Sequence, residues 1–208
     1  MDLFIITIIS IIVSIFIFYL MKYLVFRNEN IIEEYGFVID RKICNKIYLF
    51  ASIWFSLIIN WYFTDNIYTL KVINSIITIY LIMIWIIDSK YQIIFDDSLI
   101  ILSILFILGI LYLNWDLLDR ILAMIIGFII MLLLTILTRG AIGGGDVKLV
   151  AVLALWLGLD KLWPMLAWGF LIGGIFGVFL LIFRRKRKHE YFAYGPCLIL
   201  GAILQLIG

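Results

Sequence analysis

Long apolar runs constrain the fold of this 208-residue chain more than any other feature of its sequence. A helix needs about 20 apolar residues to cross a bilayer. The chain is 66% hydrophobic and only 14% charged, which is more apolar than a water-soluble domain. We therefore predict an all-α, polytopic transmembrane helical bundle of about eight spans in a lipid bilayer. The expected spans are residues 3–26, 46–63, 68–87, 98–114, 120–137, 147–159, 162–183 and 192–207.

Cations predict the orientation of these spans, because Lys and Arg concentrate in cytoplasmic loops. The cation-rich loops follow the first, third, fifth and seventh spans, and the intervening loops are poor in cations. The rich loops include Lys22, Arg27, Arg41, Lys42, Lys46, Lys90, Arg139, Lys148 and the run "RRKRKHE" at 184–190. We expect these loops in the cytoplasm and both termini outside. Asp2 replaces the basic start of a signal peptide, so we expect a retained anchor and a single integral membrane domain over residues 1–208.

Two classes of site are disfavoured by the residue types present. Cys44 and Cys197 are far apart and form no CxxC pair or zinc spacing, and His189 is the only histidine. We expect no metal site and no cofactor. No basic tract with interleaved aromatic residues indicates nucleic-acid binding, so we expect no nucleic-acid partner.

Acidic residues mark one membrane surface. Asp88 directly follows the third apolar run and Asp146 directly precedes the sixth, so the charge pattern puts both on the cytoplasmic side. Asp146 has an alternative interpretation as a helix N-cap, and Asp96 or Asp97 could cap the fourth helix. Asp88 lies at a helix C-terminus, where the dipole disfavours an anion and a carboxylate needs another reason.

A glycine loop precedes Asp146. The segment "GAIGGG" holds four glycines in six residues, which is more than a simple surface turn needs. Glycines allow another chain, such as a peptide substrate, to approach closely. Two carboxylates in hydrogen-bonding reach share a proton, so that one activates water while the other polarises a scissile carbonyl. This chemistry needs neither a metal nor a nucleophilic side chain.

The segment "GGGDVKL" at 143–149 resembles the GxGD signature of intramembrane aspartyl peptidases, in the form found in the type IV prepilin peptidase family. That family also has an aspartate at the end of an earlier span and a second aspartate eight residues later, as in Asp88 and Asp96. "YGPCLILGA" at 194–202 resembles its Gly-Pro-containing last helix. The resemblance covers residues 80–208. It implies a catalytic pair of Asp88 and Asp146, with supporting or substrate-binding roles for Asp96, Gly143, Gly145 and Lys148.

The resemblance also implies a function: an aspartic-type endopeptidase of the inner (plasma) membrane that cleaves the basic leader from prepilin or pseudopilin precursors. Two departures qualify it. Phe95 stands where the family usually has proline, and the chain lacks the zinc-binding CxxC loop of bifunctional members. We therefore expect a short form, in which N-methyltransferase activity and a role for S-adenosylmethionine stay open. The particular substrate and the oligomeric state also stay open.

Three alternatives remain at this stage. A small transporter or channel can carry acids at the cytoplasmic ends of its helices. A presenilin-like protease also uses GxGD, although a Pro-Ala-Leu motif is missing here. A catalytically inactive scaffold is the third. Separately, Gly169, Gly173 and Gly177 recur every four residues and predict a close-packing helix face, favoured as intramolecular over a dimer seam or a substrate groove.

Overall fold

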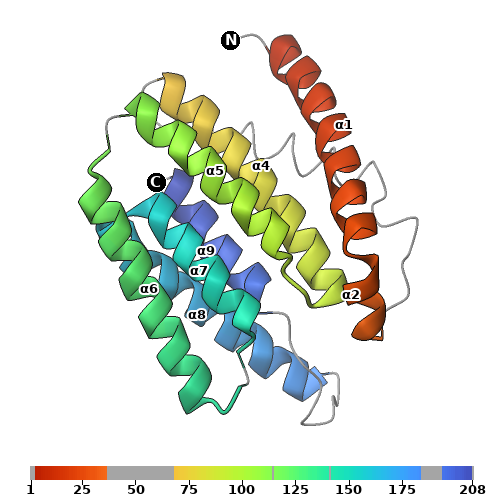
Figure 1. Ribbon diagram of the computed structural model, residues 1–208, viewed down its shortest axis with the longest axis vertical. Coiled ribbons are helices and arrows are strands. Elements are labelled where there is room, and N and C mark those ends of the chain that lie inside the picture. The colour runs from red at the N-terminus through yellow and green to blue at the C-terminus, as the bar shows by residue number, and fades with distance from the viewer. Residues whose placement is uncertain (1–2, 37–67, 114, 141, 184–193, 208) are drawn as a thin grey trace. The chain divides into compact units, whose positions relative to one another are not determined.

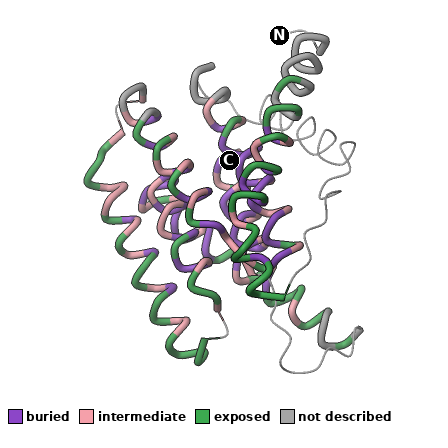
Figure 2. Tube along the Cα trace, turned by 45° about the vertical axis from the view of Figure 1, so that its right-hand side comes forward, coloured by how far each residue is buried: buried purple, intermediate pink, exposed green. Residues whose placement is uncertain are grey.

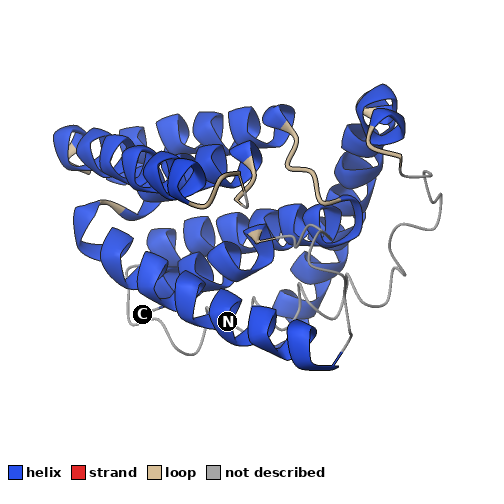
Figure 3. Ribbon diagram, turned by 90° about the horizontal axis from the view of Figure 1, so that it is seen from below, coloured by secondary structure: helices blue, strands red, loops and turns tan. Residues whose placement is uncertain are grey.

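The computed structural model describes residues 3–36, 68–113, 115–140, 142–183 and 194–207 (Figure 1). Every regular element in these residues is a helix (Figure 3), which confirms the predicted all-α fold. The helices are α1 (Leu3–Arg27), α2 (Glu29–Glu34), α4 (Tyr68–Tyr91), α5 (Asp96–Leu113), α6 (Leu117–Leu137), α7 (Gly144–Leu157), α8 (Leu159–Phe183) and α9 (Gly195–Ile207).

The helices begin and end within a few residues of the expected apolar runs. The expected span 46–63 lies outside the described residues, together with Cys44 and the basic loop that contains His189. Local signals explain several of the observed ends. Asp116 caps α6 by accepting a hydrogen bond from the Leu118 N–H at 3.0 Å. The same helix ends where Gly140, at a φ of 83°, donates its N–H to the Thr135 carbonyl at 2.8 Å.

Three helices in the described part of the chain are long and apolar enough to cross a membrane: Ile73–Tyr91 of α4, Leu117–Leu137 of α6 and Leu159–Phe179 of α8. Helix α9 is apolar but shorter. Leucine and isoleucine side chains cover the outer face of α6, for example Leu133 and Ile136. Such a face is suited to lipid rather than to water. The count of about eight spans and the outside termini stay predictions.

Contacts between Cα atoms divide the chain into two compact units, Met1–Ile87 with Ile207–Gly208, and Asp88–Leu206. In the first unit, Asn28 links α1 to α2. Its side-chain amide donates to the Leu24 carbonyl at 2.9 Å, and its own carbonyl accepts from the Ile32 N–H at 3.1 Å. The second unit contains both aspartates of the expected catalytic pair. The single domain expected over 1–208 stays a prediction.

Helix α7 forms the core of the second unit, as the buried segments in Figure 2 show. Its buried residues are Asp146, Val147, Leu149, Val150, Leu153, Ala154, Trp156 and Leu157. Helix α6 packs closely on it at Gly127, where a Cβ would lie 3.1 Å from the Ala154 Cβ and 3.4 Å from Val150. The missing side chain therefore lets the two helices approach each other.

Glycines also bring α8 and α9 together. A Cβ at Gly169 would lie 3.1 Å from Leu198, and one at Gly201 would lie 3.0 Å from the Gly169 nitrogen. A Cβ at Gly173 would collide with the Tyr194 ring. The predicted intramolecular packing face is therefore confirmed for the first two glycines of the expected stripe, whereas nothing described lies within 4 Å of a Cβ at Gly177.

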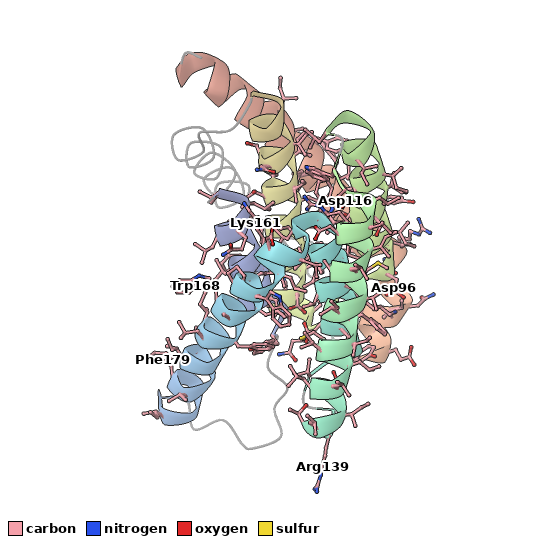
Figure 4. All side chains as sticks on the ribbon, turned by 90° about the vertical axis from the view of Figure 1, so that its left-hand side faces the viewer. Asp96, Asp116, Arg139, Lys161, Trp168 and Phe179 are labelled. Atoms are coloured by element: carbon pink, nitrogen blue, oxygen red, sulfur yellow. The ribbon has the colours of Figure 1, made fainter. Side chains whose placement is uncertain are left out.

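A polar network closes the turn between α7 and α8. The Arg120 guanidinium lies 4.4 Å from the centre of the Trp115 ring and donates to the Trp156 carbonyl at the end of α7. Asp119 accepts from the Leu159 N–H at 3.3 Å, at the start of α8. The backbone groups freed at this turn are thus satisfied by side chains of α6. Figure 4 shows Asp116 and Lys161 at this end of the unit and Arg139 at the other.

Candidate active site

Asp146 is the third residue of α7, which begins at Gly144 with Gly143 as its N-cap. The alternative in which Asp146 itself is the N-cap is therefore wrong. Instead its carboxylate reaches back to the Gly143 backbone N–H, the arrangement in which a side chain at the third helical position bonds the capping residue. Asp146 is only 7% exposed. The glycine loop thus turns the chain so that an acid enters the protein interior.

Burial sets the ionisation of Asp146. Removing a carboxylate from water disfavours its charged form, and this raises the pKa of Asp146 from 3.8 to about 6. The hydrogen bond from Gly143 acts in the opposite direction, because it favours the carboxylate. The group is therefore able to hold or release a proton near neutral pH, which is what a general acid or base requires.

Asp88 lies in the last turn of α4 and is 3% exposed. The chain turns immediately after it: Gln92, at a φ of 55°, donates its N–H to the Asp88 carbonyl at 2.8 Å. Among the described residues, the Asp88 Oδ2 atom is buried without a hydrogen-bond partner. Buried polar atoms usually have one, so this oxygen is available to a proton shared with a second acid or to a donor on a substrate.

Gly195 brings the two acids together. A Cβ on Gly195 would collide with the Asp88 carboxylate, with its carboxyl carbon at 3.2 Å, and would lie 3.3 Å from the Asp146 Oδ1 atom. Since 3.2 Å and 3.3 Å are measured from one point, the two carboxylates lie within the sum of these distances. They are close enough to interact electrostatically. The end of α4 and the starts of α7 and α9 therefore meet at one buried pair of acids.

Sequence reasoning did not include Gly195 among the site residues. Its signal was present in the "GP" pair before the last helix, which carried part of the family resemblance. Only the fold shows why a side chain is excluded there: Gly195 is the first residue of α9 and is buried directly against Asp88. The backbone of Gly195 therefore borders the two acids, where another residue would place a side chain.

Asp96 and Lys148 form an ion pair outside the buried acids. Lys148 Nζ lies 2.7 Å from Asp96 Oδ1 and 2.9 Å from Oδ2, and both side chains are more than half exposed. Asp96 and Asp97 are the first two residues of α5, not caps before it, so the expectation of a cap is wrong. An acid in the first turn still suits the helix dipole.

The remaining expected site residues shape the backbone around Asp146. A Cβ on Gly145 would lie 3.2 Å from the Ile94 Cβ, so the absence of a side chain lets the connection after α4 pack on the first turn of α7. Gly143 has an extended φ of −69° and ψ of 149°, and a Cβ there would make ordinary contact with Asp146 at 3.5 Å. Phe95, at the position of the expected proline, is buried.

The arrangement brings two buried carboxyl groups together. Among the described residues, no group of three His, Cys, Asp or Glu side chains could hold a metal ion. Cys197 is the free cysteine of the described part and is buried near both acids. Two adjacent carboxyl groups of unequal environment can divide the roles of acid and base between them.

Comparison with known proteins gives one family. The model of the type IV leader peptidase family matches residues 75–178, which is half of the chain. A prepilin leader peptidase/N-methyltransferase of Bacillus subtilis strain 168 is 32% identical over 78 residues, which is 38% of this chain and 32% of the relative. The protein of the same name in Aeromonas salmonicida strain A449 is 33% identical over 69 residues, 33% of this chain and 24% of the relative.

The matched segments therefore span about a third of the Bacillus relative and about a quarter of the Aeromonas relative. No solved structure matches the chain significantly. The family match contains Asp88, Asp96, Asp146 and Lys148, and it includes the end of α4 and the start of α7, which carry the two acids. The chain belongs to the type IV leader peptidase family.

Proposed function

We propose that the protein is a membrane aspartyl endopeptidase that removes the basic leader from prepilin or pseudopilin precursors at the cytoplasmic face of the inner membrane. One observation carries the proposal: Asp88 and Asp146 are both buried and both lie against the backbone of Gly195. The family match and the names of the relatives supply the reaction and the class of substrate.

In the proposed mechanism the two acids share one proton. The Gly143 N–H favours the ionised form of Asp146, so we assign Asp146 as the base that takes a proton from water. Asp88, whose Oδ2 atom has no donor among the described residues, holds the shared proton and donates it to the carbonyl oxygen of the scissile bond. The water oxygen bonds to the carbonyl carbon. The carbon–nitrogen bond then breaks: the leaving amine takes the proton held by Asp146, and one hydroxyl of the intermediate returns its proton to Asp88, which restores both acids to their starting states.

Glycine leaves room for a substrate beside the acids. A Cβ on Gly144, the first residue of α7, would meet nothing described within 4 Å. The curated relatives are also named N-methyltransferases. We do not extend methylation or S-adenosylmethionine binding to this chain, because the expectation of a short form without the CxxC loop leaves that second activity open.

Co-expression with a prepilin-like precursor tests the proposal. The wild-type chain should shorten the precursor by its leader, as measured by the mass of the product. The variants Asp88→Asn and Asp146→Asn should leave the precursor intact while accumulating in membranes to wild-type levels. Asp160→Asn is the matched control, because Asp160 is an exposed acid on α8, and this variant should cleave normally. Normal cleavage by either of the first two variants refutes the assignment.

The transporter alternative predicts a different result from the same variants. Purified protein in proteoliposomes would move protons down an imposed pH gradient, and the movement would be lost in Asp88→Asn and Asp146→Asn. The peptidase account predicts no such flux above that of empty liposomes. If the wild-type chain moves protons and leaves the precursor intact, the protein is a transporter and not a peptidase.

A further inference from the structure

The connection between α4 and α5 and the first residue of α5 each contact α7, and the two contacted residues lie on either side of Asp146 in the sequence. Ile94 packs on Gly145, where a Cβ would be 3.2 Å away. Asp96 holds Lys148 with both of its carboxylate oxygens, at 2.7 Å and 2.9 Å. A single short segment of chain thus holds the residue before Asp146 and the residue two positions after it.

The same connection is fixed to Asp88 at its other end. The Gln92 N–H donates to the Asp88 carbonyl at 2.8 Å. Phe95 is buried, and its carbonyl accepts from the Ser98 hydroxyl at 2.6 Å and from the Ser98 N–H at 3.0 Å. The segment from Asp88 to Asp96 is therefore tied down along its length. It joins one acid of the pair to the helix that carries the other.

We propose that the ion pair of Asp96 and Lys148 is a positioning device that sets the distance between the Asp88 and Asp146 carboxyl groups. The inference rests on the proposed peptidase function and gives its site a means of alignment. Neither residue of the ion pair lies among the buried carboxyl groups, so both act through Asp146 rather than on a substrate. Misplacement of a reacting group by about 1 Å costs roughly 100-fold in rate, so a small shift of the first turn of α7 is sufficient.

Two observations favour positioning over a role in stability or in binding the leader. Both side chains are more than half exposed, and ion pairs of this kind contribute little to global stability. Both oxygens of Asp96 are already engaged by Lys148, so Asp96 is not a free anion for a basic leader. What the ion pair does is link the first residue of α5 to the N-terminal part of α7, close to Asp146.

Kinetics of leader cleavage by the purified full-length chain test the proposal. Asp96→Asn, Lys148→Met and the double variant should each lower kcat by roughly 10- to 100-fold at unchanged KM. Because the two residues act as one unit, the double variant should be no worse than either single variant. Lys148→Arg and the exchanged pair Asp96→Lys with Lys148→Asp should recover most of kcat. The proposal is overturned if the loss of kcat in the double variant equals the product of the two single losses. It is also overturned if the exchanged pair has no higher kcat than the double variant, or if Asp96→Asn changes only KM.

A second readout needs no cleavage. Cys197 is buried beside both acids on the first turn of α9. In a Cys44→Ser background, the rate of maleimide labelling of Cys197 reports access to the acids. This rate should rise several-fold in Asp96→Asn and Lys148→Met and return to the wild-type rate in the exchanged pair. Unchanged labelling overturns the positioning role. A wild-type chain that cleaves no precursor overturns the peptidase function instead, and the labelling result still decides the positioning role.

Discussion

The Asp88 carboxyl carbon and the Asp146 Oδ1 atom lie 3.2 Å and 3.3 Å from one point, the position that a Cβ of Gly195 would occupy. Neither acid is opposed by a cation at that point among the described residues; Lys148, two positions from Asp146, is engaged with Asp96 instead. Two buried acids near each other without a cation share a proton rather than both ionise.

The substitution Gly195→Ala should disable the site without unfolding the protein. The added methyl group would collide with the Asp88 carboxylate, which must move to make room. We expect leader cleavage to fall by roughly 100-fold with unchanged helical content in circular dichroism. Gly174→Ala is the matched control on α8, because a Cβ there meets nothing described within 4 Å. Equal activity in the two variants would show that Asp88 does not need its present position.

Asp146 should make stability depend on pH in acid solution. Its pKa is about 6 in the folded chain and 3.8 as its ordinary value, so between these values the folded state binds more protons than the unfolded state. The contribution of Asp146 to stability is then greatest below pH 3.8 and falls as the pH rises to 6, by up to about 3 kcal/mol. Thermal unfolding in detergent across this range measures the slope.

The variant Asp146→Asn isolates that contribution. Asparagine does not titrate, so the slope of stability against pH between 3.8 and 6 should be smaller in the variant than in the wild type. At pH 7 the variant should also unfold at a higher temperature, because it no longer buries a charge next to Asp88. A variant with the wild-type slope would mean that Asp146 is ionised as readily in the folded chain as in water.

The approach of α6 to α7 should fail when Gly127 is enlarged. Gly127→Leu must place its side chain against Ala154 and Val150, where a Cβ alone already lies at 3.1 Å and 3.4 Å. Overpacking of this kind costs about 1 to 3 kcal/mol, which lowers the midpoint of thermal unfolding. Ile129→Leu is the control, because Ile129 lies on the exposed face of α6. Equal midpoints in the two variants would contradict the close packing of α6 on α7.

The network around Arg120 should support stability and leave catalysis unchanged. Arg120→Met removes the donor to the Trp156 carbonyl and the contact with the Trp115 ring, at the opposite end of α7 from Asp146. A lost hydrogen bond to a buried group costs about 1 to 3 kcal/mol. The unfolding midpoint should fall, while kcat/KM at a temperature that keeps the variant folded should match the wild type.

Arg139→Met serves as the matched control, because Arg139 is an exposed cation at the other end of α6. It should leave the unfolding midpoint at the wild-type value. If both substitutions lower the midpoint equally, the loss reflects a removed charge and not the network that closes the turn between α7 and α8.

Sequence alone was sufficient for the class of fold, and it singled out the two acids that the fold brings together; their catalytic role stays a prediction. Apolar runs of membrane length dictate helices, and the observed helices in the described residues begin and end near the expected residues. The positions of Asp88 and Asp146 beside such runs led us to expect both at one membrane surface, which stays a prediction. The distance between the two acids could not be predicted from the sequence, because it depends on how the end of α4 and the starts of α7 and α9 meet. No periodicity encodes this.

The glycines show where local reasoning ends. The loop before Asp146 predicted close approach of another chain, but the described contact on Gly145 comes from Ile94 of the same protein. The family resemblance implied a supporting or substrate-binding role for Lys148, whereas its ion pair with Asp96 emerged only from the fold. N-cap propensity suggested Asp146 as a cap, whereas Gly143 occupies that position because the helix begins one turn earlier than the apolar run.

The most direct test of the acid pair is a mutant cycle on purified protein in lipid nanodiscs, with a synthetic prepilin-like peptide and kcat/KM as the measurement. The account predicts that Asp88→Asn and Asp146→Asn each lose at least about 1,000-fold, and that the double variant loses no more than either, because two acids that share a proton work as one unit. Cleavage by either folded single variant within tenfold of the wild-type rate would contradict it.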